Sequence, residues 1–205
     1  MAVVRVTLIV LWAIMAGFVD CAVAQNVGTK AALNTPSLQL FQGDGTNFVL
    51  VDDLYYEIKR TGRIIRVPSG FVTDFASVPW YARSAISVLG RHSIPAIVHD
   101  YLYWEQRCSR EQADAILFDA MDEYKSSPWQ QWLVYYSVHW RAGGAWEENK
   151  EDRAKGYVRV LTGRYKVPPL NMDWPSYRED LRKAGVAEPS VAGGVPGYCF
   201  LEKAN

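Results

Sequence analysis

The sequence predicts an α+β protein, in which a small antiparallel β-hairpin or sheet packs on a bundle of three to four helices. Two observations predict it. Runs rich in Val, Ile and Tyr occupy residues 48–68, and from residue 94 onward apolar residues recur at helical spacing. The chain has 205 residues, of which 49% are hydrophobic, so it is long enough for a single domain with its own core.

The first 24 residues have the pattern of a secretory signal peptide. Arg5 is followed by an uncharged run over residues 6–19, and small residues at positions 22 and 24 suit cleavage before Gln25. The run is shorter than the roughly 20 residues that cross a bilayer as a helix. We therefore expect a protein that is periplasmic or secreted, with no transmembrane segment after the signal is removed.

Charge argues against a nucleic-acid partner. The 22 basic and 22 acidic residues balance, and the balance survives signal removal because Arg5 and Asp20 leave together. A protein that binds a phosphate backbone usually carries an excess of basic residues, and this chain as a whole has no such excess.

Two cysteines, Cys108 and Cys199, remain in the mature chain, in a compartment that we expect to be oxidising. A disulfide between them would tie the C-terminal tail to the connection between two helices. Two unpaired thiols are the alternative.

Along the chain, residues 25–47 are polar and turn-rich and are expected to form a flexible N-terminal segment. The runs "FVLVDDLYYEIKR" and "RIIRVP" flank Thr61-Gly62, which indicates a hairpin. The next stretch, "GFVTDFASVPW", is rich in turn residues and carries one acid, Asp74.

A helical piece is expected around residues 80–89, followed by an amphipathic helix whose apolar residues recur from Ile94 to Leu102. The next helix begins at Ser109, because its hydroxyl can cap the helix while Gln112 reaches back.

A third helix starts at Ser127-Pro128 and is expected to end at Gly143-Gly144. A charged helix within residues 147–164 completes a domain that spans residues 48–164. Because Pro and Gly accumulate from residue 165 on, residues 165–205 are expected to form an irregular tail.

The chemistry is expected on the two helices on either side of Cys108. His99 and Asp100 lie opposite the apolar stripe of the first helix, and Asp114 lies at the edge of the stripe of the second. Only three residues separate these helices, so they should form an antiparallel hairpin with His99 and Asp114 within about 3 Å of each other along the axis. An acid bonded to one imidazole nitrogen fixes the tautomer and lets the other act as a general base on water. Asp100 would then be available for a hard cation such as Ca²⁺.

Four motifs follow one another along the chain: "GFVTDFASVP", "VHDYLY", "SREQADAILFDAM" and "GGAW". Together they resemble an uncharacterised bacterial and phage family, domain-of-unknown-function family 1353, over about residues 48–147. The resemblance implies no established activity.

A second, local resemblance is functional. "HDYLY" is similar to the His-Asp-x-Cys-Tyr helix of secreted phospholipases A2, which is followed by a second acid on an antiparallel helix. It implies that His99 is the base, Asp100 a calcium ligand, Tyr103 a hydrogen-bonding support and Asp114 the acid that orients His99. Leu102 stands where that family has a disulfide cysteine.

The chain also lacks a glycine-rich calcium loop, so Asp74 would have to supply a further calcium ligand. Alternative chemistries are Ser77 as a nucleophile and a zinc site that combines His99 with His92 and His139.

The leading hypothesis is a hydrolase of an envelope component, either a phospholipid ester or peptidoglycan. In the alternative, these residues only brace a non-catalytic exported or phage-derived binding or structural module.

Overall fold

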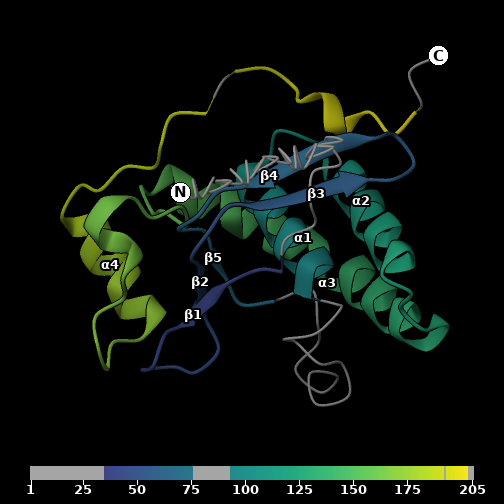
Figure 1. Ribbon diagram of the computed structural model, residues 1–205. Coiled ribbons are helices and arrows are strands. Elements are labelled where there is room, and N and C mark those ends of the chain that lie inside the picture. The colour runs from purple at the N-terminus through teal and green to yellow at the C-terminus, as the bar shows by residue number, and fades with distance from the viewer. Residues whose placement is uncertain (1–34, 76–92, 192, 203–205) are drawn as a thin grey trace, which may run out of the picture.

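The computed structural model describes residues 35–75, 93–191 and 193–202, and within them the fold is α+β, as predicted (Figure 1). Four α-helices accompany two small antiparallel sheets in this part of the chain. The predicted signal peptide and the helical piece expected around residues 80–89 lie outside the described residues.

The predicted hairpin is confirmed. Strands β3 (Leu54–Ile58) and β4 (Arg63–Val67) pair antiparallel, and Gly62 in the connecting turn has φ of 69°, a left-handed conformation that glycine adopts without steric cost. Side chains alternate between the two faces of the hairpin. The residues on its inner face are fully buried: Leu54, Tyr56, Ile58, Ile65 and Val67.

The run predicted as one strand over residues 48–60 is divided between two sheets. Its start forms β2 (Phe48–Leu50), which pairs with β1 (Leu38–Leu40) on one side and β5 (Val72–Thr73) on the other. The chain leaves β2 before Asp53, whose carboxylate accepts hydrogen bonds from the Ser69 amide and from Arg66. Asp53 directly precedes β3, Arg66 lies in β4 and Ser69 follows β4, so these bonds hold the start of β3 next to the end of β4 and not next to β2.

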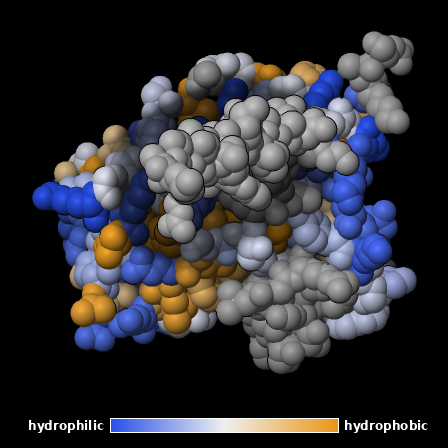
Figure 2. All heavy atoms as spheres, viewed as in Figure 1, coloured by the Kyte–Doolittle hydropathy of each residue, from blue (hydrophilic) through white to orange (hydrophobic). Residues whose placement is uncertain are grey.

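Part of the segment expected to be flexible is therefore ordered, because β1 belongs to a sheet and Phe41 after it is fully buried. Around β1 the surface is hydrophobic on the face seen in Figure 2, and Leu40 is 40% exposed.

Helix α1 (Ser93–Glu105) runs through the centre of the molecule and is buried along its whole length. The prediction of an amphipathic helix is wrong here, since β4 and β5 cover part of α1 while α2 and α3 cover the rest. His99 and Asp100 are thus 4% and 5% exposed. Buried polar groups of this kind need hydrogen-bond partners.

Helix α2 (Arg110–Glu123) begins as predicted. Ser109 caps it, and a capping box with Gln112 is complete in both directions. The buried residues of α2 recur at helical spacing: Ala113, Ile116, Leu117, Ala120 and Met121.

Helix α3 (Pro128–Ala154) continues through Gly143-Gly144, so its predicted end was wrong and the charged helix expected from residue 147 is its second half. A side chain at Gly143 would come within 3.2 Å of the Arg110 guanidinium, so the glycine lets α3 pass close to the start of α2. The helix stops before Gly156, whose φ is 83°.

The C-terminal region expected to be irregular contains 3₁₀ turns η1 (Gly163–Lys166) and η2 (Gly197–Cys199) and helix α4 (Trp174–Lys183). Asp173 caps α4 by accepting the Ser176 amide. The apolar residues of α4 join Phe41 in a second core: Trp174, Tyr177 and Leu181.

Beyond α4, a C-terminal strap (residues 185–191 and 193–196) crosses the molecule to η2 (Figure 1). There Cys199 forms the predicted disulfide with Cys108. In the described part of the chain, none of the helices combines the length and apolar character needed to span a membrane.

Candidate functional site

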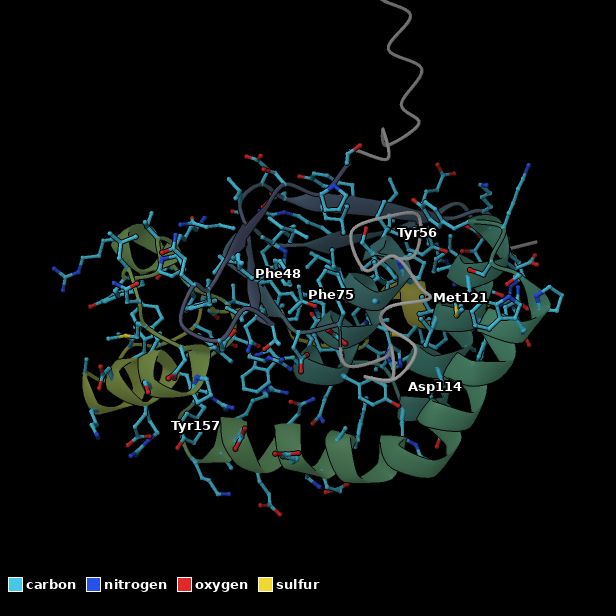
Figure 3. The ribbon with its side chains drawn as sticks, turned by 90° about the horizontal axis from the view of Figure 1, so that it is seen from below. Phe48, Tyr56, Phe75, Asp114, Met121 and Tyr157 are labelled. Carbon is cyan, nitrogen blue, oxygen red and sulfur yellow. A yellow bond between two sulfur atoms is a disulfide. The ribbon has the colours of Figure 1, made fainter. Side chains whose placement is uncertain are left out.

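The predicted contact between α1 and α2 is present. His99 Nε2 lies 2.9 Å from Asp114 Oδ1. Figure 3 shows Asp114 directed from α2 toward the interior of the molecule. The Asp114 side chain keeps 19% of its surface exposed, whereas His99 is almost fully buried.

Tyr103 completes a three-residue cluster. Its hydroxyl donates to the same oxygen, Asp114 Oδ1, at 2.6 Å, and its ring centroid lies 4.1 Å from that of His99. Burial, followed by the hydrogen bond to Asp114, raises the pKa of the Tyr103 phenol above its ordinary value, so it remains a donor. Its ring also meets Trp146 of α3 edge to face, with centroids 5.1 Å apart.

The chemistry of these partners assigns the His99 tautomer. A carboxylate accepts hydrogen bonds, so Nε2 carries the proton that points at Asp114, and in the neutral ring the basic lone pair then resides on Nδ1. Asp114 thereby orients the ring and would stabilise its positive charge after protonation.

Asp100 belongs to a second group of charges. Its Oδ2 accepts from the Thr73 hydroxyl at 2.6 Å. Burial first, and then the negative charge of Asp74, raise the pKa of Asp100 to about 6. Arg159 lies 3.3 Å from Asp74 and opposes the shift.

The two predicted calcium ligands, Asp100 and Asp74, are therefore near each other but stand beside a guanidinium. Among the described residues, no group of three or more His, Cys, Asp or Glu side chains could hold a metal ion. Ca²⁺ binding stays a prediction.

Sequence reasoning missed three neighbours of the site: Thr73, Trp146 and Arg159. The first two lie within the quoted motifs "GFVTDFASVP" and "GGAW", which were recognised only as signs of a family. Arg159 had no sequence signal, because it lies 85 residues from Asp74.

Phe75, which follows Asp74, is a further local feature. It is 1% exposed and has φ of 54°, an unusual conformation for an aromatic residue, and its amide donates to the Thr73 hydroxyl at 3.2 Å. Strained backbone of this kind often accompanies functional sites. The alternatives Ser77 and His92, and the side chain of His139, lie outside the described part of the structure.

The structure thus defines a small α+β protein in which segments around residues 99, 114 and 146 meet at one largely buried His–Asp–Tyr cluster, while the segment around residue 73 contacts the neighbouring Asp100. Residues 48–138 match the model of the family described as protein of unknown function (DUF1353), which is the family that the four motifs had indicated. Comparison with curated proteins found no match, and neither did comparison with solved structures.

Proposed function

We propose that this protein is a hydrolase in which His99 activates water. The observation that supports the proposal is the convergence of His99 Nε2 and the Tyr103 hydroxyl on one oxygen of Asp114. In the proposed reaction, His99 Nδ1 accepts a proton from water as the hydroxyl attacks the carbonyl carbon or phosphorus of a phospholipid ester, or the carbonyl carbon of a peptidoglycan amide. The imidazolium then returns this proton to the leaving oxygen of the ester or the leaving nitrogen of the amide.

In this mechanism His99 is the catalytic residue, whereas Asp114 and Tyr103 position it. Asp114 holds the ring in one tautomer and offsets the imidazolium charge, and Tyr103 keeps the carboxylate in place by donating to it. Positioning of this type contributes through geometry, because a general base must lie within hydrogen-bond reach of the proton it takes.

The proposed substrate is an envelope component, a phospholipid ester first and peptidoglycan second. The sequence of residues 1–24 supports export to the periplasm or the exterior, and the Cys108–Cys199 disulfide is what an oxidising compartment favours. A Ca²⁺ ion held by Asp100 and Asp74 would polarise the bond under attack, and calorimetric titration with CaCl₂ tests this addition separately.

The experiment is a hydrolysis screen with phospholipid vesicles and purified peptidoglycan, run on the wild type, His99→Gln and Asp114→Asn. Loss of a general base lowers the rate by about 10²- to 10⁴-fold, and Asp114→Asn should lower it by a smaller factor. The exposed control Glu147→Gln should leave the rate unchanged. Full activity of a folded His99→Gln variant would refute the proposal.

A second candidate function, a non-catalytic exported or phage-derived binding or structural module, is favoured by the burial of α1 on every side. In that case the cluster only braces α1, α2 and α3. The wild type should then be inactive in the screen, and His99→Gln should lower the melting temperature with no other effect.

A further inference from the structure

A separate cavity lies between the C-terminal strap and the body of the molecule. It has a volume of about 710 Å³, within the range of small-molecule binding sites. Its walls come from α1, β4, α3, η1 and the strap. Its lining combines aromatic, charged and hydroxyl side chains, among them Tyr101, Trp104, Arg153, Lys166 and Glu188.

This cavity is distinct from the His99 cluster. The α1 residues that line it, Tyr101, Trp104 and Glu105, lie about 140° to 240° round the helix axis from His99. His99, Tyr103 and Asp114 do not line the cavity. The two sites therefore use opposite faces of α1.

The three carboxylates of the cavity are all engaged. Asp53 pairs with Arg66 at 2.8 Å, and Glu105 pairs with Arg107 at 3.1 Å. Glu188 accepts the Trp104 indole N–H at 2.7 Å and also two backbone amides. These bonds use Arg66 and Arg107 to neutralise two of the three acids.

Two cations remain, and within the described part of the chain neither forms an ion pair with a carboxylate. Lys166 Nζ donates to the Ser69 hydroxyl at 2.7 Å. Arg153 donates to the backbone carbonyls of Trp104 and Glu105, where the negative end of α1 offsets part of its charge. Among the described residues the hydrogen-bond partner of Lys166 is a neutral hydroxyl, so an anion in the cavity would gain most at Lys166.

The strap holds this cavity in shape before any ligand arrives. Glu188 fixes one end of it, and Arg107 fixes the other by donating to the Gly194 carbonyl at 3.0 Å and 3.1 Å. A ligand binds more tightly to a preformed site, because no loop has to become ordered when it binds.

We propose that the cavity binds a small hydroxylated anion, a sugar acid or a sugar phosphate, with its anionic group on Lys166. The hydroxyls of Ser69, Thr162 and Ser190 match the hydroxyl groups of such a ligand, and Tyr101 and Trp104 provide an apolar wall. The proposal is independent of hydrolysis at His99.

Isothermal titration of the purified protein with glucuronate, glucose 6-phosphate and glucose tests it. At least one of the two anions should bind, glucose should bind more weakly, and comparison of the anions distinguishes a carboxylate ligand from a phosphate ligand. Lys166→Met should weaken anion binding by about tenfold or more, whereas Lys166→Arg should retain it. The circular dichroism melt of each variant verifies its fold.

Lys150→Met is the matched control, because Lys150 is 66% exposed and lies outside the cavity. Its affinity for the anions should equal that of the wild type. The inference is overturned if neither anion binds the wild type, if glucose binds as tightly as the anions, or if Lys150→Met weakens binding as much as Lys166→Met.

Discussion

Asp114 Oδ1 receives two donors, and this makes the Tyr103 hydroxyl a sensitive point of the site. Tyr103→Phe removes that donor but keeps the ring against Trp146. Because the hydrogen bond ends on a charged group in a partly buried place, the variant should lose about 1 to 2 kcal/mol of unfolding free energy, measured by urea denaturation.

Tyr55→Phe is the control for this prediction. The Tyr55 hydroxyl contacts Asp53 at 3.4 Å on the outer face of the hairpin, so its loss should cost less than about 0.5 kcal/mol. Equal losses of unfolding free energy in the two variants would show that the bond from Tyr103 to Asp114 stabilises the protein no more than the exposed contact of Tyr55 does.

Asp100 should give the protein a pH-dependent stability. Its pKa is about 6 in the folded protein and 3.8 for an ordinary aspartate, so the folded state binds the proton more tightly than the unfolded state. The stability that the folded protein gains from protonated Asp100 is fully present below about pH 4 and is lost as the pH rises through 6. Asp100→Asn cannot ionise and still accepts from Thr73, so at pH 7 it should melt at a higher temperature than the wild type, by the equivalent of about 1 to 3 kcal/mol.

Thermal melts between pH 4 and pH 7.5 check this prediction, with the exposed residue Asp122 replaced by Asn as the control. The gap between Asp100→Asn and the wild type should close toward pH 4. A gap of constant size at every pH would mean that the variant acts through packing and not through charge.

At the scale of single elements, α3 offers two adjacent glycines with different surroundings. A methyl group at Gly144 meets no atom of the described residues outside its own helix backbone within 4 Å, whereas one at Gly143 meets the Arg110 guanidinium at 3.2 Å. Gly144→Ala should therefore raise the unfolding free energy by about 0.5 to 1 kcal/mol through helix propensity, and Gly143→Ala should gain less. Urea denaturation measures both. If neither substitution stabilised the protein, the helix would not be continuous here in solution.

The elements that could be predicted from sequence are those set by local signals. The capping box of α2 lies within four residues, and the β3–β4 hairpin has its turn at Thr61-Gly62. The burial of α1 on all sides and the continuity of α3 through its glycines depend on the helices packed against them, which periodicity does not record.

The candidate site likewise combines a local contact, which could be predicted from the sequence, with long-range contacts, which could not. The contact of His99 with Asp114 followed from helical spacing and a short connection, since the two residues are 15 apart. The contacts of Asp100 with Thr73 and of Asp74 with Arg159 span 27 and 85 residues. Contacts of that length come from the topology, so a single sequence gives no spacing rule for them.

At the scale of the whole molecule, the chain returns on itself after α4. The first core surrounds α1, while a second core joins α4 to Phe41 near the start of the described chain. The C-terminal strap then runs from α4 to η2, next to the end of α1. The last segment is thus held at several places, which include Glu188, Gly194, Tyr198 and the disulfide at Cys199.

The disulfide should supply most of the stability that this closure adds. Cys108 and Cys199 are 91 residues apart, and closing a loop of this length restricts the unfolded chain by about 4 to 5 kcal/mol in the chain-entropy account. The double variant Cys108→Ala/Cys199→Ala should lose up to about that amount by urea denaturation, and the wild type in reductant should match it.

Hydrogen exchange locates the change within the molecule. Faster exchange is expected at residues 193–202, whereas α1 and α2 should keep their protection because their packing does not depend on the strap. Glu188 remains bonded to Trp104 and to the backbone near Val160, so the start of the strap should also stay protected. Uniform loss of protection over all helices would instead mean that the disulfide supports the central core itself, and the strap could then no longer be regarded as a separate closing element.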